Sequence, residues 1–139
     1  MNGTLLIYAP DLDKGDLLWH HLGNGVTAQQ GTASWQDNEA MSALSARSLD
    51  AFTLVLLPGD QVRWFSVPMP SKQRALIASL PFQIEDQIST PIEQMHVVPG
   101  LFKEGRHTAL AIEHSTLAEI IGALKKHHIQ PSLITAAYL

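Results

Sequence analysis

Cysteine is absent from the 139-residue sequence, which excludes disulfide bonds, thiolate zinc sites and cysteine nucleophiles. Basic residues are also scarce, since nine Lys and Arg against thirteen Asp and Glu give a formal net charge of −4. A chain without excess positive charge lacks the field that holds nucleic acid or anionic lipid non-specifically. We therefore expect no nucleic-acid partner.

Long hydrophobic runs are lacking as well. The uninterrupted apolar stretches are short, such as residues 5–10 and 54–58, whereas a membrane-spanning helix needs about 20 such residues. The first ten residues lack the basic start and long apolar region of a signal peptide. We expect a soluble chain that is not exported. Because residues 136–139 lie in an apolar run, we also expect a longer parent chain that continues beyond them.

The residues that are present favour a folded domain with a core, since 45% are hydrophobic and 16% are charged. Short apolar runs bounded by turn residues indicate strands, and apolar spacings of three and four indicate helices. Expected strands cover residues 5–8, 17–22, 26–30, 52–57, 61–67, 95–101, 108–113 and 133–134, and expected helices cover 35–47, a segment between 71 and 90, and 115–128. This order, roughly βββαββαββαβ, predicts a mixed α/β (α+β) fold.

The middle of the chain carries the clearest local signals. A turn at Pro58-Gly59 predicts that residues 52–57 and 61–67 pair as a hairpin. Trp64 and Phe65 then point to opposite faces of their strand, so at least one of them is buried. Pro81 interrupts an apolar helical stripe, which predicts a kink or two short helices.

Two capping patterns mark expected helix starts. Ser34 precedes Asp37 by three positions, and Thr116 stands in the same relation to Glu119. In a capping box the first side chain accepts from the backbone of the new helix. We expect helices to begin at these two places.

Seven histidines raise the question of a metal site. The adjacent pairs His20-His21 and His127-His128 diverge on a strand or a helix and cannot easily chelate one ion. No H-E-x-x-H motif occurs. Only His96, His107 and His114, which come from the expected strand pair, could lie close enough together to share an ion, and nothing in the sequence requires it. We expect surface histidines and no metal site.

Catalytic and phosphate-binding motifs are also missing. The sequence contains no G-x-S-x-G, no G-x-x-x-x-G-K-[ST] and no G-x-G-x-x-G. The carboxylate pair Glu85-Asp86 fits a solvated helix face or a contact surface for a basic partner. Arg63 to Phe65, with Lys72 and Arg74, is the one basic and aromatic hint of nucleic-acid binding, and it stands against the acidic balance of the chain. We expect no catalytic and no cofactor-binding residues.

Several motifs in the second half resemble the cytoplasmic region of bacterial type II secretion system protein L. They are Leu56 to Val62 (LLPGDQV), Val67 to Ser71 (VPMPS), Arg74 to Leu76, Leu80 to Gln87 (LPFQIEDQ), Glu93 to His96, and Leu110 to Glu113 followed by a helix and Ile129-Gln130-Pro131. His128 stands where this family commonly has a glycine. The match covers residues 50–135 well, and residues 1–49 fit loosely.

The resemblance implies an actin-like or RNase H-like superfold. Residues 1–139 would form the N-terminal part of that cytoplasmic domain, with a first sheet and helix in 1–49 and the hairpin, kinked helix, strand pair and C-terminal helix in 50–139. Nucleotide binding in this superfold relies on a hairpin after the first strand. The equivalent segment, Ala9 to Asp16, lacks the D-x-G-[TS] spacing. The likeness therefore carries no ATPase activity with it, and we expect neither an enzyme nor a cofactor.

The resemblance also implies a function. Protein L belongs to the inner-membrane platform of type II secretion, where its cytoplasmic region docks the secretion ATPase, protein E, and couples it to pseudopilus assembly. The parent chain would continue to a transmembrane helix and a periplasmic domain that contacts protein M, and a homodimer is allowed. This fragment would then lie at the cytoplasmic face of the bacterial inner membrane. The alternative is an actin-like nucleotide-binding protein of a related type IV pilus platform.

The motifs do not name the docking residues. We expect Glu85, Asp86 and Glu93 at a polar rim, with Arg63 and Arg74 as alternatives. The competing interpretation is that all five are simply solvated. A typical interface buries about 800 Å² per partner, so a few charges cannot form it alone.

Overall fold

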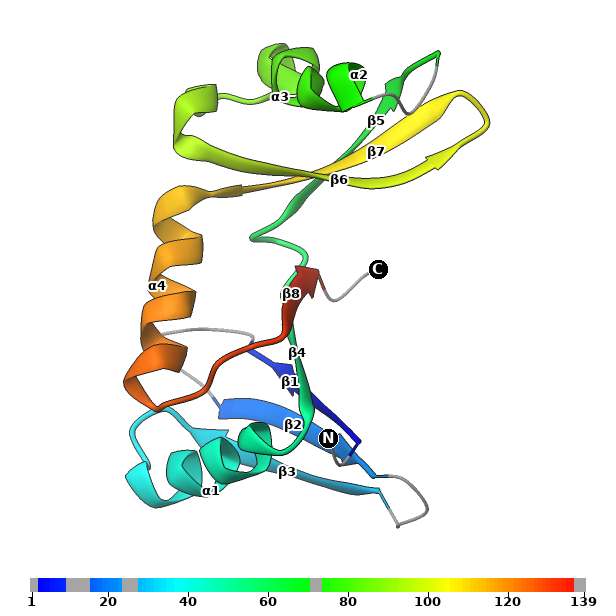
Figure 1. The fold of residues 1–139 in the computed structure, drawn as a ribbon. Coiled ribbons are helices and arrows are strands. Elements are labelled where there is room, and N and C mark those ends of the chain that lie inside the picture. Colours follow the sequence, from blue (N-terminus) through cyan, green and yellow to red (C-terminus); the bar gives the residue numbers. More distant parts are fainter. Residues whose placement is uncertain (1–2, 10–15, 24–27, 71–73, 137–139) are drawn as a thin grey trace. The chain divides into compact units, whose positions relative to one another are not determined.

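The computed structural model describes residues 3–9, 16–23, 28–70 and 74–136 (Figure 1). Internal contacts divide the chain into two units. The first unit combines residues 1–59 with 118–139, and the second comprises residues 60–117. Each unit has its own sheet.

The first unit contains a five-stranded sheet in the order β3-β2-β1-β4-β8. Its strands are β1 (Thr4–Tyr8), β2 (Asp16–Leu22), β3 (Gln29–Ser34), β4 (Phe52–Leu57) and β8 (Leu133–Ala136). β1, β2 and β3 pair antiparallel, and β4 pairs parallel with both β1 and β8. Helix α1 (Asn38–Leu49) connects β3 to β4, and α4 (His114–Lys126) precedes β8. Each helix lies in a connection between two parallel strands, β3 to β4 for α1 and β4 to β8 for α4, and both connections run in the same direction across the sheet. Because such crossover connections are right-handed, both helices lie on the same face of the sheet.

The covered face of this sheet forms the core of the first unit. Leu5, Ile7, Leu17 and Val55 alternate inward along their strands and are fully buried. The residues that meet them from α1 and α4 include Met41, Leu44, Ile120 and Leu124, all at most 1% exposed. Two-residue periodicity in the strands and three- to four-residue periodicity in the helices therefore build one layer.

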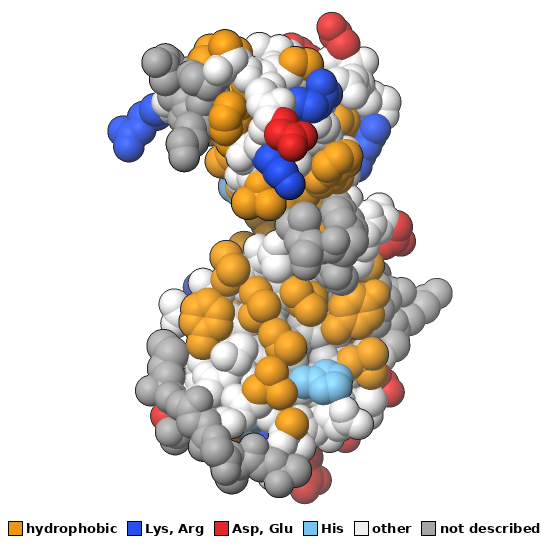
Figure 2. Space-filling model, turned by 90° about the vertical axis from the view of Figure 1, so that its right-hand side faces the viewer, with side chains coloured by type: hydrophobic (Ala, Val, Ile, Leu, Met, Phe, Trp, Pro, Cys, Tyr) orange, Lys and Arg blue, Asp and Glu red, His pale blue; other side chains and the backbone are white. Residues whose placement is uncertain are grey.

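The opposite face of the same sheet carries apolar side chains that remain partly exposed. The strand registers align Leu18, Tyr8 and Leu56 in one row across β2, β1 and β4. A second row joins Leu6, Leu54 and Leu133 across β1, β4 and β8. Figure 2 shows hydrophobic side chains gathered over this face, in the lower part of the view. We call this surface the uncovered sheet face.

The second unit contains a three-stranded antiparallel sheet in the order β5-β7-β6. Its elements are β5 (Arg63–Pro68), α2 (Arg74–Ala78), α3 (Leu80–Ile84), the 3₁₀ turns η1 (Glu85–Gln87) and η2 (Ile92–Gln94), β6 (Met95–Lys103) and β7 (Arg106–Glu113). The core of this unit lies between sheet and helices, and it contains Phe65, Val67, Met69, Leu80, Ile84, Ile92, Met95, Ala109 and Ala111.

The predicted pair of residues 95–101 and 108–113 is confirmed as β6 and β7. Glu104 and Gly105 connect the strands, with φ of 54° and 75°. A two-residue turn with positive φ at both positions matches the twist of a hairpin, and glycine adopts that conformation without strain. Pro99 lies at the irregularity of the edge strand β6, where a missing N–H is tolerated.

The predicted hairpin of residues 52–57 with 61–67 is wrong. β4 pairs with β1 and β8 in the first unit, whereas β5 pairs with β7 in the second. β4 has buried side chains on one face, such as Val55, and half-buried leucines on the other, such as Leu54. Apolar residues on both faces are typical of a central parallel strand. The turn after Leu57 therefore separates two sheets.

The expected helix starts also change. Asp37 caps α1, because its Oδ1 accepts from the N–H groups of Glu39 and Ala40, both at 3.1 Å. Ser34 is the last residue of β3. α4 begins at His114, so Thr116 lies inside the helix and does not cap it.

The other local expectations have mixed outcomes. Residues 74–84 form two short helices, as predicted, and Pro81 lies in the first turn of the second one. The strand expected at 26–30 overlaps β3 only at residues 29 and 30, and residues 26 and 27 lie outside the described ones. Phe65 is buried and Trp64 is half exposed, which confirms their opposite orientation.

Candidate docking surface

Helix α3 presents an exposed aromatic ring in the second unit. Leu80 and Ile84 are buried one turn apart, so the residue between them, Phe82, points away from the core and is 70% exposed. Glu85 and Asp86 follow Phe82 by three and four positions and are exposed on η1. An apolar ring with two carboxylates beside it therefore forms one surface.

Arg63 supports this surface from the neighbouring strand β5. Its Nη2 donates to the carbonyl oxygen of Gln87, the last residue of η1, at 3.2 Å. Its guanidinium also lies 5.2 Å from the ring centre of Phe65, a distance at which a cation is attracted to an aromatic face. Arg63 thus has a structural contact that fixes the end of the acidic turn.

The structure places the other two expected rim residues elsewhere in the second unit. Arg74 is exposed at the start of α2. Glu93 lines a pocket of about 320 Å³, together with Gln94, Glu113, His114 and Ser115. Of the five residues expected at a docking surface, the structure thus connects Arg63 to the segment that carries Glu85 and Asp86.

The histidines of the strand pair converge only in part. The rings of His96 and His114 lie 5.8 Å apart. His107 is buried, its Nδ1 donates to the Thr108 carbonyl at 2.9 Å, and its ring contacts Phe102. Within the described ranges, no three His, Asp or Glu residues are grouped so that they could hold a metal ion.

Two further expectations concern membranes and nucleotides. Among the described residues, no helix combines the length and the apolar character needed to cross a bilayer. The hairpin on which the nucleotide argument depends spans residues 9–16, and residues 10–15 lie outside the described part.

Exposed apolar side chains of the second unit were not among the predicted site residues. Phe82, Trp64 and Leu101 are 70%, 51% and 79% exposed. The sequence contained a signal for Phe82, because this residue falls off the stripe of residues 77, 80, 84 and 88. Leu101 lies in the irregular part of β6, where strand alternation does not predict burial.

A family model described as type II secretion system (T2SS), protein L matches residues 17–136. The chain belongs to the type II secretion system protein L family. A protein L of Pectobacterium carotovorum subsp. carotovorum is 30% identical over 95 residues, which are 66% of this chain and 22% of that protein. A protein L of Pseudomonas aeruginosa is 35% identical over 88 residues, 60% of this chain and 23% of that protein. The matched part is thus less than a quarter of these relatives.

Solved structures of similar fold support the predicted superfold. The cytoplasmic domain of EpsL, an inner membrane component of the type II secretion system of Vibrio cholerae, matches with a TM-score of 0.74 and 18% identity, covering 96% of this chain and 56% of that one. A chain of the PilM-PilN type IV pilus biogenesis complex matches with a TM-score of 0.57 and 15% identity, covering 96% and 47%. The predicted mixed α/β, actin-like fold is confirmed.

Proposed function

We propose that this chain is a non-catalytic part of the inner-membrane platform of type II secretion, that it docks the secretion ATPase, protein E, and that it couples the ATPase to pseudopilus assembly. Membership of the protein L family carries this proposal. The surface that best suits docking consists of Phe82, Glu85 and Asp86, with Arg63 behind it. We call it the α3 surface.

The chemistry of the α3 surface divides between anchor and rim. Phe82 supplies a rigid apolar ring, the kind of side chain that dominates binding energy when a partner buries it. Glu85 and Asp86 would mainly set the encounter rate and the salt dependence of binding, because exposed charges at a rim are screened. Glu93 on η2 and Arg74 on α2 would take part only where the interface extends beyond Phe82 and η1.

The remaining parts of the proposal concern the parent protein. It would hold this region at the cytoplasmic face of the inner membrane through a transmembrane helix, and its periplasmic domain would contact protein M. A homodimer would bring two α3 surfaces to the platform.

Calorimetric titration with the N-terminal domain of the cognate ATPase tests the docking role, using the whole cytoplasmic region of the parent. Phe82→Ala should weaken binding at least about tenfold. Leu101→Ala is the matched control, because Leu101 is at least as exposed as Phe82 in the same unit but belongs to β6; it should change affinity less than about twofold. No binding by the unmodified region contradicts the proposal, and equal effects of the two changes reject the α3 surface.

The alternative is an actin-like nucleotide-binding protein of a type IV pilus platform, which the fold likeness to the PilM-PilN complex supports. Thermal unfolding with and without Mg-ATP distinguishes the two. A midpoint raised by several degrees at millimolar Mg-ATP favours the nucleotide-binding role. An unchanged midpoint favours the platform component without a nucleotide.

A further inference from the structure

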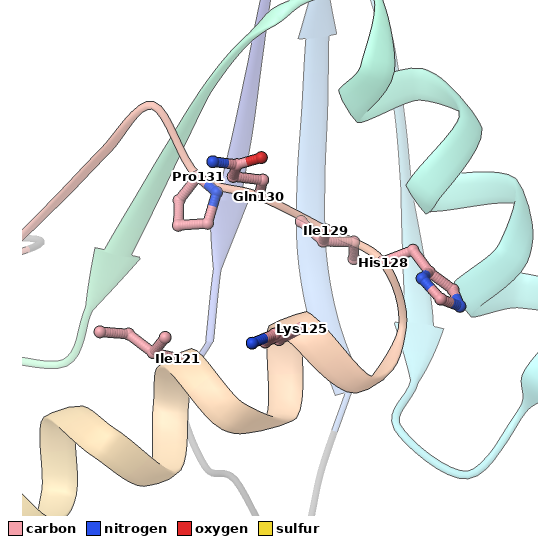
Figure 3. A pocket seen from close by; sticks show the side chains of 6 residues that line it. All are labelled: Ile121, Lys125, His128, Ile129, Gln130 and Pro131. Carbon is pink, nitrogen blue, oxygen red and sulfur yellow. The ribbon is translucent and has the colours of Figure 1, made fainter.

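A pocket of about 500 Å³ lies where α4 ends and the chain turns towards β8 (Figure 3). It is lined by Ile121, Lys125, His128, Ile129, Gln130 and Pro131. All six residues belong to the first unit. The volume falls in the range of about 300–1,000 Å³ that is usual for ligand pockets.

Residues 128–131 form the wall of the pocket opposite α4, and hydrogen bonds hold this segment in place. Ser45 Oγ on α1 donates to the carbonyl oxygen of His128 at 3.0 Å. The N–H of Ser132 donates to the Thr53 carbonyl at 2.7 Å, and Ser132 Oγ accepts from the Thr53 N–H at 3.1 Å. Ile129 between these points is 2% exposed. The wall is therefore preorganised, so binding of a ligand does not lose the conformational entropy of ordering it.

The lining combines apolar surface with a single available cation. Ile121 is 44% exposed and Pro131 is half-buried. In Figure 3 the ammonium end of Lys125 points to the space between these two residues, whereas the His128 ring turns away towards α1. Among the described residues, the side-chain ammonium of Lys125 has no hydrogen-bond or ion-pair partner. An anionic group can therefore reach Lys125 without displacing another carboxylate.

The neighbouring face of α4 leaves room for a polypeptide. Gly122 is exposed next to Ile121, and a Cβ atom added to it would meet nothing within 4 Å. The backbone of a partner can thus approach the helix beside the pocket. Lys126 lies about 100° further around α4, and it lines a different pocket with Trp35 and His127.

We propose that this pocket docks an acidic segment of a partner protein. An aliphatic or aromatic side chain of that segment lies against Ile121 and Pro131, and an adjacent Asp or Glu places its carboxylate on Lys125. The unpaired cation beside apolar surface selects this chemistry, because a purely apolar ligand would leave Lys125 unused and a bare anion would leave Ile121 uncovered. The α3 surface belongs to the other unit, so this inference does not rest on ATPase docking.

A titration of the ¹⁵N-labelled 139-residue chain with the capped peptide acetyl-Leu-Asp-Phe-Glu-amide tests the proposal. The amide signals of residues 121–131 should shift with a Kd of about 0.1–1 mM. Lys125→Glu should weaken binding at least about tenfold, since it replaces an attraction with a repulsion. Lys126→Glu changes the net charge equally on the same helix and should alter Kd less than about twofold.

Two further titrations separate the apolar and ionic parts. Ile121→Ser should weaken binding of the peptide about tenfold, and so should replacement of its two acidic residues by Asn and Gln. Shifts confined to other residues, equal binding by Lys125→Glu, or equal shifts with acetate at the same concentration would each overturn the proposal. Unchanged ATPase affinity of Lys125→Glu in the whole cytoplasmic region shows that the two surfaces act separately.

Discussion

The backbone N–H of Ile129 donates a hydrogen bond to the carbonyl oxygen of Leu124 at 2.9 Å and closes the end of α4. The N–H of His128 donates to the Lys125 carbonyl at 3.0 Å, and His128 has a φ of 59°. These two bonds form a Schellman motif, in which the left-handed position is usually a glycine. His128 therefore holds the left-handed position of this cap, where the resemblance to the protein L family implies a glycine.

We predict that His128→Gly stabilises the protein. A left-handed conformation costs a non-glycine residue roughly 1–2 kcal/mol, and the greater entropy of glycine in the unfolded chain offsets about 0.5–1 kcal/mol of that gain. The free energy of unfolding in urea should rise by about 0.5–1 kcal/mol. His127→Gly is the control and should lower the free energy of unfolding, because it removes a ring whose centre lies 6.0 Å from the centre of the Trp35 ring. A lower urea midpoint for His128→Gly would contradict the assignment.

Gly122 lies in the interior of α4, where glycine is unfavourable. Gly122→Ala adds a Cβ that meets no atom within 4 Å, so the helix should gain about 0.8–1 kcal/mol. Gly31→Ala provides the contrast, because its added Cβ would lie 2.8 Å from an atom of the Trp19 ring. The midpoints of thermal and urea unfolding should rise for Gly122→Ala and fall for Gly31→Ala. Destabilisation by Gly122→Ala would show that this face of α4 is not open.

The cap of α1 gives a third prediction. Asp37→Ala removes an acceptor for two backbone N–H groups and should lower the free energy of unfolding by about 1 kcal/mol. Ser34→Ala removes the residue that the sequence pattern favoured as the cap, and it should cost less than about 0.5 kcal/mol. Urea denaturation of both variants checks the ranking. A larger loss for Ser34→Ala would return the cap to the position expected from sequence.

Helices and strands followed from apolar spacing, and so did the hairpin of β6 with β7, but the partners of β4 and β5 did not. The pairing of Ser66 with Thr108 joins residues from distant parts of the chain, and no turn signal near Pro58 encodes it. A sign was nevertheless present. The nearly continuous apolar run from Phe52 to Leu57 is typical of a strand with neighbours on both sides, whereas a two-stranded hairpin at the surface alternates apolar and polar residues.

In the candidate docking surface, too, some features were predictable from the sequence and others were not. Exposure of Glu85 and Asp86 was predictable from their position beside an apolar helical stripe, and exposure of Phe82 followed from the same spacing. The contact of Arg63 with the Gln87 carbonyl was not predictable, because it depends on β5 lying next to η1 in the folded unit. Residue patterns within one element thus carried over, whereas a contact between elements distant in sequence, such as β5 with η1, did not.

The uncovered sheet face gives a prediction about the whole chain in solution. Leu18 and Leu133 are 44% and 52% exposed on it, and contiguous apolar surface of this kind binds hydrophobic dyes and promotes association. The double change Leu18→Thr and Leu133→Thr retains strand propensity and should lower dye fluorescence by about half. Leu101→Thr, a change at a single leucine that is 79% exposed in the second unit, should have a much smaller effect. Equal loss of fluorescence in both variants would show that the leucines of the sheet do not form one surface.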